Sequence, residues 1–142
     1  MPPWVRSPDV PRLDVRVVAP EREVWSGEAD LVVAKGTDGD VGIMPGHAPM
    51  LISLAIHPLR VTQPDGAVQV VLVDGGFLHV TSTEEGTRID VLAEHAALPQ
   101  EIDASAAEAR LDELRLRAEQ QDDAEAQTAL AKALMRAEHG AR

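Results

Sequence analysis

The stretch DGDVGIMPGHAPML, residues 38–51, contains the side chains whose types and spacing come nearest to a chemical site. Asp38 and Asp40 are followed by His47, so the carboxylates and the imidazole are candidate metal ligands, and the histidine is a candidate general base. An EF-hand calcium loop that opened at Asp38 would need its bidentate glutamate where Pro49 stands. The stretch is therefore not a calcium loop of that kind.

Metal-binding barrels of the cupin kind are a second possibility, because they are also built from strands with glycine-histidine turns. Their metal site relies on a close H-x-H pair and a carboxylate. The histidines that precede the last helix are never two residues apart: His47, His57, His79 and His95. No Walker loop, dinucleotide fingerprint, H-E-x-x-H or G-x-S-x-G motif occurs in the sequence. We assign no catalytic and no metal-binding residue, and keep a cupin-like metal enzyme, or a small-molecule binder with a helical tail, as the alternative.

Glycine and proline favour a structural explanation of the same stretch. Gly42 and Gly46 allow a tightly turned backbone, and Pro45 and Pro49 fix φ on either side of His47. We therefore interpret the stretch as a rigid, shaped turn.

The composition narrows the classes of partner. A chain of 142 residues suits one domain, or one small domain with an appendage. Its formal net charge of -11 argues against nucleic acid as a partner. There is no cysteine, and no apolar run reaches the roughly 20 residues that span a bilayer. We expect no direct membrane insertion, and we expect residues 1–12, which lack an apolar signal core, to form a loose arm.

The chain changes character at Pro99. All ten prolines lie at or before this position, no glycine lies between Gly86 and Gly140, and the part after it is rich in alanine. Turn residues punctuate short apolar runs before the boundary, whereas the sequence after it has helical periodicity. The predicted fold class is mainly β with an α appendage. An N-terminal antiparallel β-sandwich at 13–99 is followed by a C-terminal antiparallel helical hairpin at 100–142.

Alternation and turn chemistry predict the strands. The segment LDVRVVA at 13–19 alternates apolar and polar residues, as in a strand with one wet face. Turn residues at 64–66 and 85–86 predict two hairpins between β-branched runs. We expect the runs 70–73 and 89–92 to be core strands.

Two apolar stripes with the same spacing predict the two helices of the hairpin. They comprise Ala107, Leu111, Leu114 and Ala118 in the first helix, and Ala126, Leu130, Ala133 and Ala137 in the second. Ser105 with Glu108 fits a capping box, while Asp103 is a competing N-cap, and QQDD at 120–123 can turn the chain. Alanine buries far less apolar surface than leucine, so the hairpin should hold to its neighbours weakly and be able to detach.

Several segments together resemble the epsilon subunit of F-type ATP synthases. GDVGIMPGHAPML is similar to that family's signature, approximately G-x-[LV]-G-I-x-P-G-H-A-P-L-L. LVDGGFLHV resembles its [SV]-G-G-x-L-x-V strand, and IDVLAEHA resembles its last sandwich strand. QQDD and LAKALMRA are similar to the interhelical turn and the second helix. The segments follow the family's order over roughly residues 13–138, and the arm at 1–12 has no clear counterpart.

The resemblance implies a non-enzymatic rotor subunit. In this family the small sandwich lies at the foot of the central stalk, where one side contacts the gamma subunit and the other end meets loops of the membrane c-ring. Asp40 takes the position of an acidic residue at the ring-facing turn. His47, Pro49, Met50 and Leu51 fall in the stretch that meets ring and stalk, and an exposed Met-Leu pair would serve as an apolar anchor. The implied location is peripheral, on the cytoplasmic face of the bacterial plasma membrane.

The resemblance also bears on ATP as a regulatory ligand. Many relatives bind ATP on the hairpin through a motif resembling [IL]-D-x-x-R-A, which reads IDASAA here, so Ala106 stands in place of the arginine. A second candidate, LDELRL, lies too late in the chain and ends in leucine. The candidate nucleotide contacts are Ile102, Asp103, Arg110 and Arg115. We expect ATP to bind weakly or not at all, and we expect no other cofactor.

The family's hairpin can also extend along the stalk and restrain ATP hydrolysis, when its basic residues meet an acidic segment of the beta subunit. The second helix here offers Lys132, Arg136 and Arg142. Lys132 and Arg136 are four residues apart, so both project from one face and can act together. The alternative is that they are ordinary solvated partners of Glu125, Thr128 or Glu138.

Overall fold

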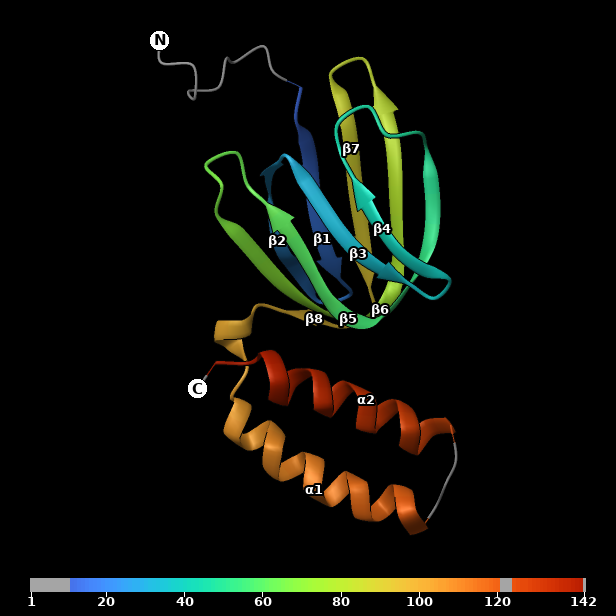
Figure 1. Cartoon of the computed structure of the whole chain (residues 1–142), viewed down its shortest axis with the longest axis vertical. Helices are drawn as coiled ribbons and strands as arrows, with labels where there is room; N and C mark the ends of the chain where they lie inside the picture. The colour runs from blue at the N-terminus through green and yellow to red at the C-terminus, as the bar shows by residue number, and fades with distance from the viewer. Residues whose placement is uncertain (1–10, 121–123, 142) are drawn as a thin grey trace.

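The computed structural model describes residues 11–120 and 124–141. Strands occupy the first two thirds of the chain and two helices follow (Figure 1). In chain order the elements are β1 (Leu13–Ala19), β2 (Arg22–Ala29), β3 (Leu31–Gly36), β4 (Gly39–Ile43), β5 (Met50–Thr62), β6 (Val68–Thr83), β7 (Gly86–Ala93), β8 (Ala96–Ala97), the short 3-10 helix η1 (Pro99–Glu101), α1 (Ala104–Gln120) and α2 (Ala124–His139). Most of the expected arm, most of the expected interhelical turn and Arg142 lie outside the described residues.

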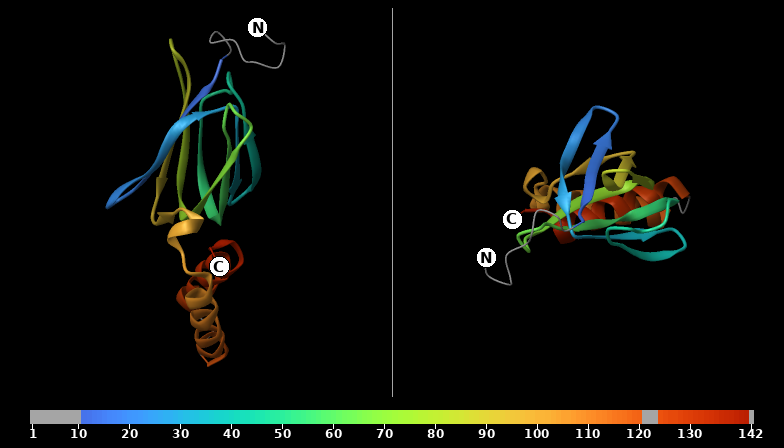
Figure 2. Two further views of the ribbon diagram at one scale, coloured as in Figure 1. Left: turned by 90° about the vertical axis from the view of Figure 1, so that its left-hand side faces the viewer. Right: turned by 90° about the horizontal axis from the view of Figure 1, so that it is seen from above.

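The strands form one continuous sheet in the order β2-β1-β7-β6-β5-β3-β4, with β8 paired to β6. The long strands β5 and β6 pair from Met50↔Val80 to Thr62↔Val68. Both strands bend, so the sheet folds over on itself into two packed layers (Figure 2). The predicted β-sandwich is confirmed. Within the described sheet β1 and β7 pair in parallel and the other neighbours pair antiparallel.

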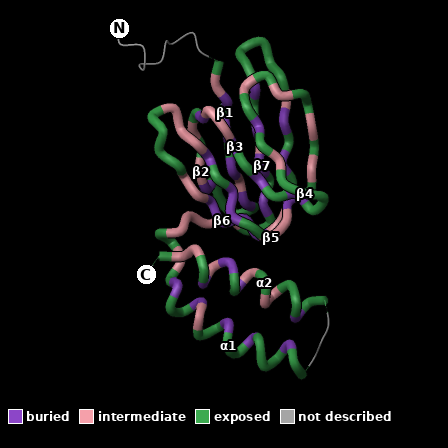
Figure 3. The backbone as a smooth tube through the Cα atoms, in the orientation of Figure 1, coloured by how far each residue is buried: buried purple, intermediate pink, exposed green. Residues whose placement is uncertain are grey.

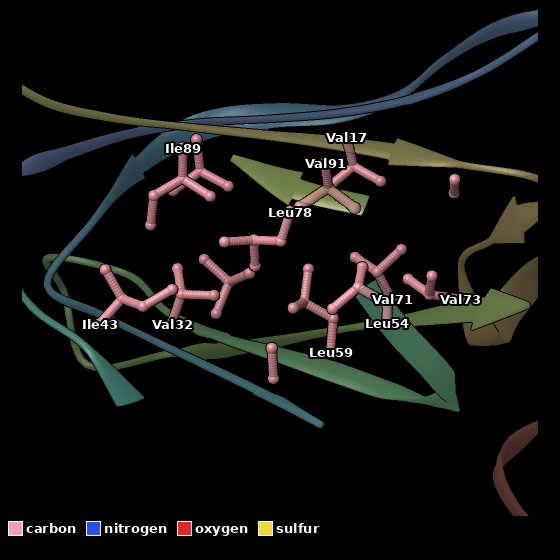
Figure 4. Close-up of a cluster of buried hydrophobic side chains, with 14 of the residues drawn as sticks. Val17, Val32, Ile43, Leu54, Leu59, Val71, Val73, Leu78, Ile89 and Val91 are labelled. Atoms are coloured by element: carbon pink, nitrogen blue, oxygen red, sulfur yellow. The ribbon is translucent and has the colours of Figure 1, made fainter. Parts of the chain in front are cut away.

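The core lies between the two layers and follows from the two-residue period of a strand. In β1, Leu13, Val15 and Val17 are fully buried, whereas the residues between them are not. Side chains of β1 and β7 point across the gap toward those of β3, β4 and β5 (Figure 4). Each fully buried Val or Leu contributes roughly 1.5–3 kcal/mol relative to an exposed position. This aliphatic cluster therefore dominates the stabilisation of the sandwich.

The run 89–92 follows the core prediction only in part. Ile89 and Val91 are fully buried, but Leu92 is 56% exposed. Successive side chains of a strand point to opposite faces, so Leu92 faces outward, whereas Ile89 and Val91 face inward. In 70–73, by contrast, three consecutive residues are buried. The hairpin packs against β6 near this point and covers the outer face.

The tripeptide Asp74-Gly75-Gly76, which is typical of a turn or bulge, lies inside β6, where the strand bends without reversing. Gly75 and Gly76 have φ of +92° and +122°, which residues with a side chain rarely adopt. A Cβ on Gly76 would lie 2.2 Å from the carbonyl oxygen of Leu92. Glycine at this position therefore allows β6 to bend while it stays paired with both β5 and β7.

The helices pack against each other through the predicted stripes (Figure 3). The buried members are Ala107, Leu111, Leu114, Ala118, Ala126, Ala133 and Ala137, and Leu130 is half-buried. Asp103 is the N-cap of α1, because its Oδ1 accepts hydrogen bonds from the N–H groups of Ser105 at 3.0 Å and Ala106 at 3.2 Å. The prediction of a capping box at Ser105 and Glu108 is therefore wrong.

The hairpin lies beneath one end of the sandwich, with α2 between α1 and the strands (Figures 1 and 2). Its linker is fastened to the sandwich, since β8 pairs with β6 and Arg22 in β2 donates to Glu101 in η1 at 2.9 Å. Donation from Arg22 and from the Leu98 N–H holds the pKa of Glu101 below its ordinary value. A lowered carboxyl pKa stabilises the folded state above the unfolded pKa, so this fastening is complete at neutral pH and is lost only in acid.

Candidate functional site

The loop 44–49 between β4 and β5 is a tight turn fastened to a neighbouring strand. Gly46 has a φ of +90°, and its N–H donates to the hydroxyl of Thr87 in β7 at 2.7 Å. The N–H of His47 donates to the carbonyl of Met44 at 3.1 Å. Thr87 is buried, so its hydroxyl finds in this loop the hydrogen-bond partner that burial requires. The predicted shaped turn is confirmed.

His47 is half-buried, and its ring is engaged by the loop itself. Nδ1 lies 2.8 Å from the carbonyl oxygen of Ala48, and because a carbonyl oxygen only accepts, Nδ1 is the donor. Among the residues that the structure describes, no group of three His, Cys, Asp or Glu side chains is placed to hold a metal ion. Within that part of the chain, the histidine shapes the loop and faces no cluster of ligands.

Met50 and Leu51 begin β5 and point to opposite faces. Met50 is half-buried and packs against the sandwich core, whereas Leu51 is 65% exposed. The expectation of an exposed Met-Leu pair is therefore wrong for Met50, because consecutive strand residues do not share a face. Leu51 remains an apolar side chain on the surface.

Asp40 lies at the other end of β4 from His47 (Figure 1). It pairs with Lys35 across the β3–β4 hairpin, next to the turn at 37–38. Asp40 and Leu51 line one open hollow beside this turn. The predicted docking residues therefore do not form one cluster: two of them share the hollow, and His47 belongs to the loop at the far end of β4.

A further apolar feature crosses the outer face of the sheet. Phe77 in β6 and Leu92 in β7 are cross-strand neighbours, and both are more than half exposed. Val18 in β1 pairs with Leu92, and Leu51 in β5 is diagonal to Phe77. We call Val18, Leu51, Phe77 and Leu92 the outer apolar strip. The sequence pattern did not predict this strip. A signal for it was present, because Phe77 and Leu92 each neighbour an apolar residue and only one member of such a pair can face the core.

The two candidate inhibitory cations lie on the side of α2 that faces the sandwich. Arg136 donates to Oδ2 of Asp74 in β6, whose side chain is only 2% exposed. Lys132, one helical turn earlier, is half-buried. The interpretation of Arg136 as a solvated partner of its helical neighbours is wrong, because its partner is a buried carboxylate on the sandwich.

The candidate nucleotide contacts are spread along the hairpin. Asp103 is engaged as the N-cap of α1, and Ile102 is half-buried in the linker. Arg110 donates to Glu113 of the same helix at 3.1 Å. Arg115 lines a shallow groove between α1 and α2, about 18 Å along the helix from Asp103 at 1.5 Å per residue. These side chains do not converge on one place.

Comparison with known proteins decides the family. Residues 12–99 match the family described as ATP synthase, Delta/Epsilon chain, beta-sandwich domain. The ATP synthase epsilon chain of Rhodococcus jostii is 44% identical over 126 residues, which cover 88% of this chain and 94% of the relative. The chain belongs to the ATP synthase epsilon family.

Other members of the epsilon family are similarly close. The epsilon chain of Streptomyces avermitilis is 44% identical over 115 residues, covering 81% of this chain and 86% of the relative. That of Streptomyces coelicolor is 45% identical over 103 residues, covering 72% and 80%. A chain of the Euglena gracilis mitochondrial ATP synthase (OSCP/F1/c-ring, rotational state 1) shares the fold with a TM-score of 0.75 and 19% identity, covering 95% of this chain and 86% of that one.

Membership in the epsilon family makes this chain a non-catalytic subunit of ATP synthase. It excludes the alternative of an independent metal enzyme. Among the described residues, α1 and α2 both fall short of the length and apolar content that a membrane-crossing helix needs.

Proposed function

We propose that this epsilon chain is a rotor subunit of the central stalk. It joins the gamma subunit and the membrane c-ring to the catalytic head during proton-driven ATP synthesis, and it is held peripherally at the cytoplasmic face of the bacterial plasma membrane. Family membership supports the complex, and the outer apolar strip is the observation that carries the docking role. Copurification of the tagged chain with the membrane ATP synthase tests the proposal.

The outer apolar strip has the properties of a docking surface. Phe77 and Leu92 are each about half exposed in the isolated chain. A partner that covered them would gain about half of the roughly 1.5–3 kcal/mol that complete burial of such a side chain contributes. The strip crosses four adjacent strands, so its side chains keep a fixed spacing. The next cross-strand row is polar at Arg16, Asp90 and His79, and it ends at Leu51, which pairs with His79. An apolar patch with a polar rim on a rigid sheet is typical of a protein interface, and we assign this one to the gamma subunit.

The β3–β4 turn is the second proposed contact. Asp38 and Asp40 are both exposed there. The turn is tied to β5 by a hydrogen bond from the Thr37 N–H to the Ser53 carbonyl at 3.0 Å. An acidic turn held in one geometry suits a loop that presents positive or hydrogen-bond-donating groups. We assign it to the loops of the c-ring, in keeping with the position of Asp40 in the family's pattern.

The loop 44–49 connects the strands that carry these two surfaces. Pro45 and Pro49 fix φ within it, and Gly46 is fastened to Thr87. A stiff connection transmits torque between two partners, whereas a flexible loop would absorb it. This is the physical role we give to the glycine-proline-histidine motif.

The hairpin supplies the proposed restraint on ATP hydrolysis, when Lys132 and Arg136 meet the beta subunit of the catalytic head. In the docked position Arg136 is engaged by Asp74, so this contact requires the hairpin to leave the sandwich. Reversing both charges would disturb docking as well, because Arg136→Glu places a second carboxylate beside Asp74. Lys132→Glu alone keeps the Asp74–Arg136 pair intact, so it disturbs docking less than the double reversal and is the cleaner test of inhibition.

Ending the chain after Leu98 should leave a folded sandwich that still joins the complex, and should raise ATP hydrolysis about fivefold, near the low end of allosteric coupling. The cluster between the two layers is built from residues 13–98, so the deletion removes none of its members. Circular dichroism of the isolated sandwich tests whether it is folded, and steady-state hydrolysis by inverted membranes measures the rise in ATP hydrolysis. An unfolded product would show that 13–99 is not an independent unit.

The full chain with Lys132→Glu should reproduce part of that rise, and the effect should weaken as salt screens the exposed charges. Arg117→Glu, on an exposed position of α1, is the matched control and should leave hydrolysis unchanged. A rise on deletion without a rise in Lys132→Glu would remove Lys132 from the inhibitory contact. If neither the deletion nor Lys132→Glu raises ATP hydrolysis, the chain couples the other subunits and does not inhibit hydrolysis.

Isothermal calorimetry of the isolated chain should find ATP affinity weaker than about 1 mM, or no binding. The missing arginine at Ala106 removes a charge-assisted hydrogen bond to phosphate worth roughly 1.5–3 kcal/mol, which is about ten- to a hundredfold in affinity. Asp103, moreover, already accepts two N–H groups as the N-cap. Micromolar binding would contradict this expectation, and loss of that binding in Arg115→Ala but not in Arg117→Ala would locate the substitute.

A further inference from the structure

The face of α2 that is turned to the sandwich is covered over its last two turns. Glu125 and Thr128 on this face are exposed, whereas Lys132, Met135, Arg136 and His139 are buried or half-buried. Spacings of three and four residues place them all on one side of the helix. The hairpin is therefore attached to the sandwich at the C-terminal end of α2, and the same face is exposed at the N-terminal end of the helix.

Asp74 stands on the face of β6 opposite the sandwich core. Val71 and Val73 belong to the core cluster, so Leu72 and Asp74, which alternate with them, point away from it. Both are nevertheless buried, at 2% exposure each. Arg136 reaches the carboxylate from α2, which contacts β6. Asp74 is thus a carboxylate buried between the sandwich and the hairpin.

Ala141, which lies just after α2, forms hydrogen bonds with the linker. The N–H of Ala141 donates to the carbonyls of Pro99 at 3.0 Å and Ile102 at 3.1 Å. The N–H of Ala104, at the start of α1, donates to the carbonyl of Ala141 at 3.0 Å. Main-chain hydrogen bonds therefore join the end of α2 to the start of α1 and to the segment that leads out of the sandwich.

Gly140 makes this junction possible. Its N–H donates to the carbonyl of Arg136 at 2.8 Å. A Cβ there would lie 2.6 Å from that oxygen and 2.8 Å from Cγ2 of Ile102. A side chain at this position would push the end of α2 away from the linker, and it would displace Arg136, which lies one helical turn earlier.

We propose that the Asp74–Arg136 ion pair and the junction of Gly140 and Ala141 with the linker form a latch, which holds the hairpin on the sandwich at one end and opens in a single step. The latch is formed within this chain and needs no partner subunit. Its consequence for ATP hydrolysis rests on the function proposed above.

Burial of the Asp74 carboxyl group explains the single step. Two opposite charges attract strongly away from water, but each loses hydration, so the pair is favourable only while both members are present. If Arg136 withdrew while α2 stayed docked, the Asp74 carboxyl group would stay buried without its partner. That state is strongly unfavourable, so loss of the pair and departure of the helix occur together. The alanine-rich hairpin has few large apolar side chains to oppose that departure.

The full chain has no cysteine, so two introduced cysteines can report on the latch. Spin labels at Glu84→Cys on the β6–β7 turn and at Glu119→Cys near the end of α1, both exposed positions, give a sandwich-to-hairpin distance by pulsed electron paramagnetic resonance. We expect one narrow distance distribution in this background. Arg136→Ala should raise the ratio of released to docked hairpin by about 10- to 100-fold, because it leaves Asp74 without its partner. Gly140→Val should shift the ratio in the same direction.

Two controls test the mechanism. Arg117→Ala removes an exposed arginine from α1 and should leave the distribution unchanged. The double variant Asp74→Leu with Arg136→Met replaces the pair by apolar side chains and should keep the hairpin docked. An unchanged distribution in Arg136→Ala, or release in the double variant as complete as in Arg136→Ala, would overturn the latch. Circular dichroism checks that the sandwich of each variant stays folded.

Hydrolysis by the assembled complex separates the latch from the inhibitory function. Gly140→Val releases the hairpin and keeps both Lys132 and Arg136, so it should lower ATP hydrolysis. Release in the isolated chain together with lowered hydrolysis supports both proposals. Release without any change in hydrolysis overturns the inhibitory function and supports the latch.

Discussion

A Phe77→Glu variant should fold as the parent chain does and lose about 100-fold or more of its affinity for the rest of the ATP synthase. Phe77 is more than half exposed in the isolated chain, so the substitution should change its stability by only about 0.5 kcal/mol. At the proposed gamma interface the carboxylate would be buried without a partner, and truncating an aromatic hot spot alone costs about 2 kcal/mol or more. Titration of the purified chain against epsilon-depleted complex measures the affinity.

Val68→Glu is the matched control, because Val68 is an exposed apolar residue at the β5–β6 turn, outside the outer apolar strip. It should bind as the parent does, and Leu92→Glu should behave like Phe77→Glu. An equal loss in Val68→Glu would mean that added negative charge weakens binding wherever it is placed. Full affinity in both Phe77→Glu and Leu92→Glu would remove the strip from the interface.

Replacing Gly76 by alanine should remove about 4 kcal/mol or more from the free energy of unfolding, a large share of the 5–15 kcal/mol typical of a domain. The new Cβ would lie 2.2 Å from the carbonyl oxygen of Leu92. β6 cannot shift to relieve this contact, because it is paired with β5 on one side and β7 on the other. The φ of +122° adds strain of about 1–3 kcal/mol. Urea unfolding followed by far-ultraviolet circular dichroism measures the loss.

Gly66→Ala separates the cost of the backbone conformation from the cost of a steric clash with the new Cβ. Gly66 has a φ of +90°, yet a Cβ there would meet no atom within 4 Å. Its replacement should therefore cost only about 1 kcal/mol, from backbone conformation alone. Similar losses at Gly66 and Gly76 would contradict the account of the β6 bend.

Much of the fold could be predicted because it is encoded locally. The alternation at 13–19 and the turns at 64–66 and 85–86 appear in the structure as β1 and the hairpins that join β5, β6 and β7. The parallel pairing of β1 with β7 could not be predicted in this way, because it joins segments more than 60 residues apart. The glycine pair at Gly75 did not predict the bend of β6 unambiguously, because such pairs occur both at turns and at bends within a strand.

The candidate site could be predicted less completely, for the same reason. The turn around His47 follows from its own glycines and prolines. The Asp74–Arg136 pair spans 62 residues, and no local pattern distinguishes Arg136 from a solvated helical arginine. The outer apolar strip also joins side chains from four strands, and it exists only once their register is fixed.

Affinity purification of the tagged chain from detergent-solubilised membranes of its own host is the most direct test of its assignment as a rotor subunit. The gamma subunit, the c-ring and ATP-hydrolysing activity should copurify with the chain in fixed proportion. The same tag on Phe77→Glu should recover none of them. Recovery of the parent chain free of the other ATP synthase subunits would contradict the account.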